Sequence, residues 1–241
     1  MDAIVLAGGF ASRMGELVSD TPKQLLIVAG EPLLAHVLRS LEAVAPNRVI
    51  LAVNAAFASQ FDAFITSYNG PLQVELTVEQ AHSEGEKPGA LGALWQLVEA
   101  QHLTGPLFIA AGDNLFDFDL SRLVGLYEAT GDDIIALYDV QNRELAQLYG
   151  IATLEDGVIV DFVEKPSVPR STLAATACWL LSSSGVSALD EFLDDGGQRD
   201  ALGHFLAWRS SRARVRGIAY AGTWFDIGDP ESYAAACAHF S

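Results

Sequence analysis

Residues 3–26 read AIVLAGGFASRMGELVSDTPKQLL, and this stretch decides the fold. It opens with an apolar run, residues 3–7, which is too short for most helices and typical of a buried parallel strand. Gly8-Gly9 follow at once, where the backbone can take positive φ, approach a ligand closely and turn several N–H groups toward an anion. Because Arg13 and Lys23 come shortly after, the stretch predicts a phosphate site. A plain turn with two surface cations is the alternative interpretation.

Strand-like and helix-like segments alternate along the rest of the chain. Apolar strand patterns occur at 48–53, 72–78, 106–111, 132–140 and 173–182, and helical spacing at 32–41, 57–68 and 91–101. A further helix is expected to start at Arg199. Repeated units of this kind predict an α/β fold with a doubly wound, mostly parallel but mixed, Rossmann-like sheet. Ligands of such sheets bind beyond the carboxyl ends of the strands, where Gly8-Gly9 lie. Residues 149–153 and 158–163 read as a small β-hairpin.

Composition limits the classes of function. Half of the 241 residues are hydrophobic, which allows a substantial core, and no apolar run approaches the length of a membrane span. The formal net charge of −17 argues against binding to nucleic acid or to anionic membranes. Only two cysteines and no secretory leader pattern are present, so we expect a cytoplasmic protein. The sequence leaves a homo-oligomer open. One basic cluster is visible, Arg209, Arg212, Arg214 and Arg216. A solvated edge is its favoured interpretation, and an oligomer contact or an anion site are the alternatives.

A second motif follows the strand pattern at 106–111. This strand delivers Asp113 at its carboxyl end, near the edge where the glycine turn is expected. A carboxylate there is unfavourable without a partner or a metal ion. Mg²⁺ binds one or two carboxylates together with substrate phosphate oxygens, so Asp113 is a candidate metal ligand. The alternative is an aspartate that merely forms the turn after the strand.

These motifs resemble those of the sugar-1-phosphate nucleotidylyltransferases, and most closely those of the glucose-1-phosphate thymidylyltransferases. The matching segments are spread over nearly the whole chain: LAGGFASRM at 6–14, PKQL at 22–25, GEPL at 30–33, GDN at 112–114, YG at 149–150, EKP at 164–166 and WFDIGDPESY at 224–233. One departure is visible, because Ala11 stands where the family pattern has a third glycine.

The resemblance implies roles for residues that bind the nucleotide and the metal. Arg13 and Lys23 would act on the triphosphate, and Asp226 would join Asp113 on Mg²⁺. The remaining nucleotide contacts implied by the family are Leu6, Gly8, Gly9, Gln80 and Gly89, the last two near the base. The match around Gln80 and Gly89 is loose, and a helix-preceding loop without a ligand is an equal alternative there.

The resemblance also implies a site for the sugar phosphate. Lys165 would bind the phosphate, Glu164 would hold sugar hydroxyls and the Gly150 backbone would close over the sugar. Tyr149 and Thr176 complete the implied set, although Ala177 replaces the glycine that often follows this threonine. A lysine held by a following proline at a strand end is also a suitable point charge for a phosphomonoester.

The implied reaction joins a nucleoside triphosphate to a sugar-1-phosphate and releases pyrophosphate, within a single domain. Residues 1–115 would bind the nucleotide and residues 116–241 the sugar phosphate. The Gly-Asp-Asn segment favours dTTP or UTP, with glucose-1-phosphate as the sugar, and guanylyl transfer to mannose-1-phosphate is the alternative. A glycosyltransferase that uses Asp117 and Asp119, and a non-catalytic sugar-nucleotide sensor, are further alternatives. Asp119 alone is well placed as a helix cap.

Overall fold

The computed structural model describes residues 1–9, 14–15, 21–80 and 88–240. Their contacts divide the chain into two compact units, which we describe separately. Unit 1 comprises residues 1–87, 110–120 and 222–241, and unit 2 comprises residues 88–109 and 121–221. The C-terminal segment therefore belongs to the same unit as the N-terminus. The predicted functional halves, divided near residue 115, stay a prediction. No helix among the described residues is long and apolar enough to cross a membrane.

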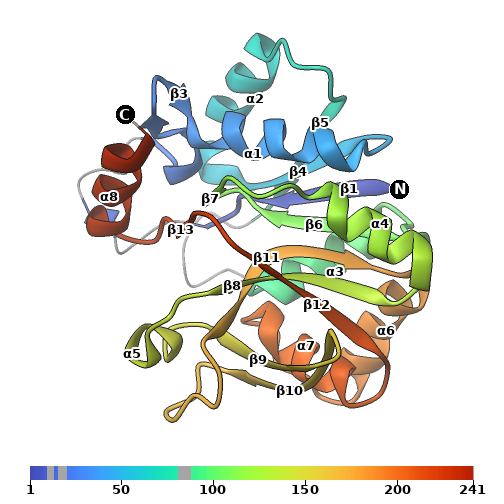
Figure 1. Ribbon diagram of the computed structural model, residues 1–241. Coiled ribbons are helices and arrows are strands. Elements are labelled where there is room, and N and C mark those ends of the chain that lie inside the picture. Colours follow the sequence, from blue (N-terminus) through green and yellow to red (C-terminus); the bar gives the residue numbers. More distant parts are fainter. Residues whose placement is uncertain (10–13, 16–20, 81–87, 241) are drawn as a thin grey trace. The chain divides into compact units, whose positions relative to one another are not determined.

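Unit 1 contains a parallel three-stranded layer in the order β5-β4-β1 (Figure 1). Its strands are β1 (Asp2–Leu6), β4 (Val49–Asn54) and β5 (Val74–Glu79). Every residue of β4 is buried, as expected for a central strand of a parallel sheet. The helix α2 (Ala58–Ser67) packs on β4 and β5. These strands appear where the apolar runs predicted them, so the carboxyl end of β1 lies at Gly8-Gly9.

Shorter elements complete unit 1. They are the 3₁₀ turns η2 (Lys23–Leu25), η3 (Glu42–Val44) and η4 (Ala55–Phe57), the strands β2 (Ile27–Val28), β3 (Glu31–Pro32), β7 (Asn114–Phe116) and β13 (Trp224–Asp226), and the helices α1 (Leu33–Leu41) and α8 (Pro230–Phe240). Strands β7 and β13 form an antiparallel pair, with Asp226 opposite Asn114. Helix α8 contacts β13 and β2, and its residues pack on a cluster that includes Met14 and Ile227.

Unit 2 is built on a mixed sheet in the order β6-β11-β8-β12-β10-β9. Its strands are β6 (Leu107–Ala111), which crosses the unit boundary, β8 (Asp133–Asp139), β9 (Gly150–Glu155), β10 (Val158–Glu164), β11 (Leu173–Leu181) and β12 (Val215–Tyr220). Because β9 also pairs with β11, the last five strands form a closed circuit of pairings. The predicted hairpin is β9–β10, and its turn places Asp156 and Gly157 at positive φ, as a tight Asp-Gly turn requires.

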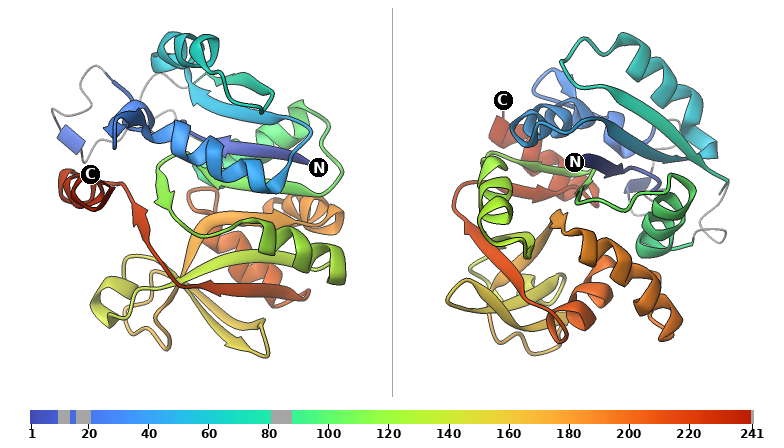
Figure 2. Two further views of the ribbon diagram at one scale, coloured as in Figure 1. Left: turned by 45° about the horizontal axis from the view of Figure 1, so that its top comes forward. Right: turned by 90° about the vertical axis from the view of Figure 1, so that its right-hand side faces the viewer.

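The helices of unit 2 are α3 (Ala90–Ala100), α4 (Ser121–Thr130), α5 (Arg143–Ala146), α6 (Ser183–Asp194) and α7 (Leu202–Ser210). Helices α3, α6 and α7 contact one another, and α7 packs on β10 (Figure 2). The predicted α/β class with a mixed sheet is confirmed. The sequence patterns did not predict α6, β12 or the pair β7–β13. The helix expected from Arg199 begins three residues later, at Leu202.

Candidate active site

Lys23 and Asp113 form an ion pair in unit 1. The Lys23 ammonium contacts Oδ2 of Asp113 and also donates a hydrogen bond of 3.2 Å to the Ile227 carbonyl. The two side chains are 11% and 19% exposed, so the pair is largely shielded from water. The turn η2 carries Lys23, and Asp113 follows the end of β6. The lysine and the aspartate of two separate sequence motifs therefore lie in direct contact.

Backbone contacts bring Asp113 to the carboxyl end of β1. The N–H of Gly112 donates to the Leu6 carbonyl at 2.9 Å. A side chain at Gly112 would come within 3.2 Å of the Gln24 Cγ and 3.3 Å of the Ala7 Cβ, so glycine permits this approach. Gly112 thus allows the aspartate motif and the glycine turn to meet.

The glycine turn itself lies against polar side chains from the neighbouring strands. A Cβ at Gly8 would come within 3.0 Å of a carboxylate oxygen of Glu79, at the end of β5. The amide of Asn54, at the end of β4, donates to the Gly8 carbonyl at 3.2 Å. Gly9 lies near Lys23, whose Cε would be 3.9 Å from an added Cβ. Carboxyl ends of β1, β4 and β5 therefore line one edge, as parallel strands require.

Asp226 lies beside Asp113 because β13 pairs with β7. The amide nitrogen of Asn114 is 3.0 Å from Oδ1 of Asp113 and 3.4 Å from Oδ1 of Asp226. The indole N–H of Trp224 donates to the Asn114 carbonyl oxygen at 2.7 Å. Two aspartates that are 113 positions apart in the sequence thus face a single amide nitrogen.

Gln24 is a candidate that the sequence motifs do not indicate. Its side chain is 1% exposed, and its Oε1 has no hydrogen-bond partner among the described residues. A buried acceptor without a donor costs about 1–3 kcal/mol, so a bound ligand or water would stabilise this site by donating to it. The P-K-x-L motif marks the position, but only the burial reveals the unpaired oxygen.

The other nucleotide-binding predictions have different placements. Gln80 is exposed and directly follows β5. Gly89 is in unit 2, at φ +80°, and a Cβ there would collide with the Arg199 carbonyl. Arg13 lies outside the described residues. The roles of these three residues stay predictions.

In unit 2, Glu164 fits between two glycines. A Cβ at Gly150 would come within 2.7 Å of Glu164 Oε2, and a Cβ at Gly203 would overlap the same oxygen. Burial raises the pKa of the Glu164 carboxyl, Lys165 and His204 oppose this shift, and Asp200 adds to it. The Glu164 carboxylate is therefore partly dehydrated, and it is flanked by Gly150 and Gly203, where a larger side chain would collide with it.

Lys165 directly follows this carboxylate at a tight point of the backbone. Its φ is +47°, and its N–H donates to the Tyr149 carbonyl at 3.1 Å. Tyr149, Gly150, Glu164 and Lys165 are thus neighbours across the β9–β10 hairpin. Thr176 is 1% exposed, and its hydroxyl donates to the Ala136 carbonyl at 2.9 Å. The Thr176 hydroxyl thus bonds to the neighbouring strand β8. Its predicted contact with the sugar rests on the family resemblance.

Asp117 has a structural partner. Its Oδ1 accepts a 2.7 Å hydrogen bond from the Thr223 N–H, and a Cβ at Gly222 would overlap this oxygen. The carboxylate therefore stabilises the turn that leads into β13. This contact accounts for Asp117 without a metal and removes one support from the glycosyltransferase alternative.

Comparison with known proteins decides the family. A model of the family described as Nucleotidyl transferase matches residues 2–241. The chain belongs to this family. The chain is 26% identical over 238 residues to mannose-1-phosphate guanylyltransferase 1 of Arabidopsis thaliana, covering 97% of this chain and 63% of that protein. It thus spans about 63% of the length of the plant relatives that it matches.

Two further proteins match this chain over nearly their full length. A UTP–glucose-1-phosphate uridylyltransferase of Haloferax volcanii is 27% identical over 245 residues, with 96% of this chain and 93% of the relative covered. Among solved structures, a Bacillus anthracis protein provisionally assigned as a glucose-1-phosphate thymidylyltransferase superposes with a TM-score of 0.87. The two proteins are 23% identical, and the superposition covers 100% of this chain and 95% of the Bacillus anthracis protein. At this level of identity the match supports the fold alone.

Proposed function

We propose that this nucleotidyl transferase transfers a nucleotidyl group from a nucleoside triphosphate to a sugar-1-phosphate. A phosphate oxygen of the sugar phosphate attacks the α-phosphorus, and the bond from that phosphorus to the β-phosphate oxygen breaks. The products are a nucleoside diphosphate sugar and pyrophosphate. The observation that carries this proposal is the contact of Lys23 with Asp113, beside Asp226, at the carboxyl end of β1.

The carboxylates of unit 1 fit a metal ion that is shared with substrate. The described residues contain no group of three or more His, Cys, Asp or Glu side chains able to hold a metal. Asp113 and Asp226 alone suit Mg²⁺, which needs only one or two carboxylates when phosphate oxygens fill its other positions. Such an ion would neutralise charge that develops on the phosphates during transfer.

The cations of the chain perform the positioning. Lys23 would leave Asp113 to contact the triphosphate, and Arg13 would stabilise the phosphates. In unit 2, Lys165 would bind the phosphate of the sugar-1-phosphate, and Glu164 would accept hydrogen bonds from sugar hydroxyls. A phosphate oxygen is already ionised at neutral pH, so the reaction requires no general base. Catalysis therefore rests on orientation and charge neutralisation.

The proposed substrates are a pyrimidine nucleoside triphosphate, dTTP or UTP, and glucose-1-phosphate. The Gly-Asp-Asn segment supports this choice, and the Haloferax volcanii relative carries a uridylyltransferase name. A second candidate is GTP with mannose-1-phosphate, which the guanylyltransferase names of the plant relatives favour.

A substrate matrix tests the proposal. Each of five nucleoside triphosphates is combined with glucose-, mannose- and N-acetylglucosamine-1-phosphate in Mg²⁺, and pyrophosphate release is measured. We expect the highest kcat/KM with dTTP or UTP and glucose-1-phosphate. A preference for GTP with mannose-1-phosphate would replace the substrate assignment and leave the reaction in place. The assignment of Asp113 and Asp226 to the metal would be wrong if Asp113→Asn and Asp226→Asn both kept full Mg²⁺-dependent pyrophosphate release. The reaction itself would be excluded if no combination of nucleoside triphosphate and sugar-1-phosphate released pyrophosphate.

A further inference from the structure

Asn114 is held in one orientation by Trp224. An indole N–H can only donate a hydrogen bond, so the Asn114 atom that faces it at 2.7 Å must be the carbonyl oxygen. The amide nitrogen therefore points the other way. Asn114 is 4% exposed, so water does not compete for either end of the amide. Trp224 thus selects which end of Asn114 faces the aspartates.

The end that faces the aspartates is a donor shared by two like charges. Its nitrogen lies 3.0 Å from Asp113 Oδ1 and 3.4 Å from Asp226 Oδ1. An amide group carries two N–H donors, one for each carboxylate. Two neighbouring carboxylates repel each other, and a common donor offsets part of that repulsion while fixing their separation.

The strand pairing explains how three distant residues meet. Asp226 is directly opposite Asn114 in the β7–β13 pair, and Trp224 is two residues before Asp226. Residues two apart on a strand share a face, so Trp224 and Asp226 both lie over Asn114. Phe225, between them, faces the opposite side and packs with the cluster around Met14 and Ile227.

We propose that Asn114, oriented by Trp224, is a positioning residue that holds Asp113 and Asp226 ready for a divalent cation. This inference rests on the proposed function for its biological purpose and on the hydrogen bonds above for its geometry. Asn114 contacts Oδ1 of each aspartate, and Oδ2 of Asp113 contacts the Lys23 ammonium. Asn114 does not itself bind the cation. An aspartate at 114 would have the same shape but would add a third negative charge and remove the donor.

The test measures Mn²⁺ bound to the nucleotide-free full-length protein, by electron paramagnetic resonance of the free ion. The variants are Asn114→Ala, Trp224→Phe and the double variant. Phe225→Leu is the matched control, because it alters the same strand on the opposite face. Thermal unfolding of each protein shows whether it is folded, and the apparent KM values for Mg²⁺ and for the sugar-1-phosphate are measured in parallel.

We expect Asn114→Ala to raise the Mn²⁺ dissociation constant about 10–100-fold, the range typical for residues that orient metal ligands. Trp224→Phe should raise it several-fold alone and add nothing in the Asn114→Ala background, because Trp224 acts through Asn114. Phe225→Leu should leave it unchanged. The apparent KM for Mg²⁺ should rise with the dissociation constant, whereas that for the sugar-1-phosphate should not.

Several results would overturn the inference. One is an unchanged Mn²⁺ dissociation constant in folded Asn114→Ala. Another is that Trp224→Phe weakens Mn²⁺ binding equally in the unaltered protein and in the Asn114→Ala background. A third is that the unaltered protein binds no Mn²⁺ at millimolar concentration. If Asn114→Ala does not fold, Trp224→Phe alone decides, and an unchanged dissociation constant refutes the proposal. Metal binding is read without turnover, so a protein that binds Mn²⁺ as expected but releases no pyrophosphate would refute only the proposed function.

Discussion

At the residue scale, Lys23 is the counter-ion of Asp113. The pair is largely shielded from water, and the ammonium also bonds to the Ile227 carbonyl. A metal ion that binds Asp113 must therefore compete with a positive charge already in place. Metal binding and movement of Lys23 to the triphosphate are thus expected to be linked.

Removal of this charge gives a first prediction. Lys23→Met should bind Mn²⁺ at least about tenfold more tightly in the absence of nucleotide, because a unit charge a few ångströms away opposes a cation by more than ~1.4 kcal/mol at intermediate dielectric. The same variant should lose most of its kcat. Lys165→Met is the control, because it removes a lysine from unit 2. Equal Mn²⁺ affinity in Lys23→Met and the unaltered protein would contradict the competition.

Glu164 gives a second prediction, on stability against pH. Burial raises the pKa of this carboxyl in the folded protein, so folding favours its protonated form. The stabilisation is complete below the ordinary pKa of a glutamate and is lost as pH rises through the raised value. Glu164→Gln mimics the protonated form. We expect it to unfold at a higher temperature than the unaltered protein at pH 8 and at the same temperature at pH 4.

The gain at pH 8 should be small, no more than about 2–4 °C, because solvent still screens this part-exposed group. Calorimetry across the pH range measures the difference. Glu164→Gln should at the same time raise the KM for the sugar-1-phosphate, since a carboxylate accepts hydroxyl donors better than an amide does. A variant that is less stable at pH 8 would show that Glu164 contributes to stability through a contact other than its charge.

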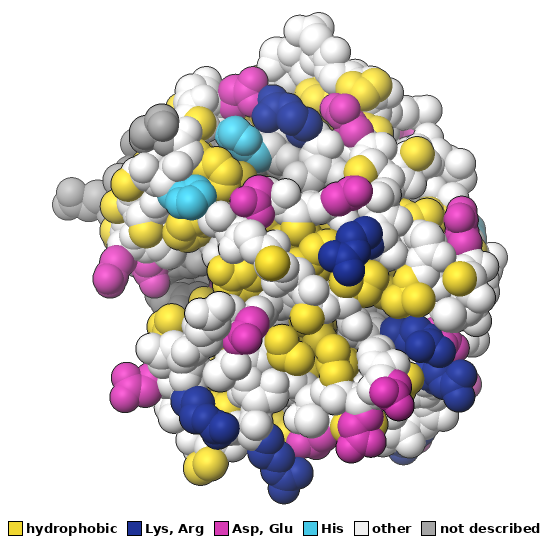
Figure 3. Space-filling model, in the orientation of Figure 1, with side chains coloured by type: hydrophobic (Ala, Val, Ile, Leu, Met, Phe, Trp, Pro, Cys, Tyr) yellow, Lys and Arg dark blue, Asp and Glu magenta, His cyan; other side chains and the backbone are white. Residues whose placement is uncertain are grey.

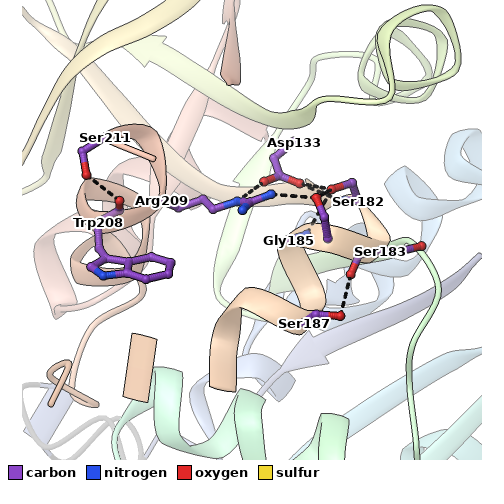
Figure 4. Close-up of polar contacts among 9 residues, drawn as sticks. Asp133, Ser182, Ser183, Gly185, Ser187, Trp208, Arg209 and Ser211 are labelled. Atoms are coloured by element: carbon purple, nitrogen blue, oxygen red, sulfur yellow. Dashed lines mark hydrogen bonds and ion pairs between the residues drawn. The ribbon is translucent and has the colours of Figure 1, made fainter. Parts of the chain in front are cut away.

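At the scale of elements, Asp133 joins a strand to two helices of unit 2 (Figure 4). It is 1% exposed at the start of β8, and its Oδ1 accepts bonds from the N–H and the hydroxyl of Ser182 at 2.7 and 2.6 Å. Ser182 in turn caps α6 by accepting from the Gly185 N–H. Arg209, on α7, donates to Oδ2 of Asp133 at 2.8 Å.

This network corrects the interpretation of the arginine cluster. The sequence favoured a solvated edge for Arg209, Arg212, Arg214 and Arg216, which is wrong for two of them. The Arg209 side chain is 13% exposed and forms an ion pair with Asp133. The Arg216 side chain is 21% exposed and forms an ion pair with Asp132. Consecutive aspartates pair with arginines about 80 residues later, a pairing that no local pattern shows.

The third prediction follows from this buried pair. Arg209→Met should lower the free energy of unfolding by about 3–5 kcal/mol, because it leaves the Asp133 charge buried without its partner. Arg214→Met, at an exposed position of the same cluster, should change it by less than about 0.5 kcal/mol. Urea unfolding measures both. Similar losses in the two variants would mean that the cluster acts only through its overall charge.

At the scale of the whole molecule, the formal net charge is −17, from 31 acidic and 14 basic residues. On the face shown in Figure 3, acidic side chains are spread among basic ones and apolar ones. Such an excess of one sign destabilises the folded state through self-repulsion. The cations that remain are therefore needed where they form specific contacts, as Lys23 and Arg209 do.

The fourth prediction concerns salt. Raising KCl from about 0.01 to 0.2 M shortens the screening length from ~30 to under 10 Å, so the unfolding temperature should rise by several degrees. Sucrose at equal osmolarity separates screening from excluded-volume effects, because it leaves the charges unscreened. A fall in the unfolding temperature with KCl would indicate that the ion pairs, and not the net repulsion, dominate the electrostatics.

The sequence by itself determined the α/β class, most of the strands and the family, because these depend on local periodicity and on short motifs of fixed spacing. Strand-end logic likewise pointed to Asp113 near Gly8-Gly9. Helix α6 and strand β12 were missed. Helix α6 begins almost directly after the end of β11, so the apolar pattern of the strand runs into that of the helix. Strand β12 lies in a stretch whose arginines obscure the alternation of apolar and polar residues that marks a strand.

Only the tertiary structure decided which distant side chains share a contact. The bonds of Asn114 to Asp113, Asp226 and Trp224 depend on the register of β13 against β7, and a shift of one residue would turn each side chain to the opposite face. The unpaired oxygen of Gln24 and the Asp133–Arg209 pair depend on burial, which is a property of packing. Composition and spacing do not show which polar atoms become buried or which register two distant strands take, so the positioning of the site could come only from the folded chain.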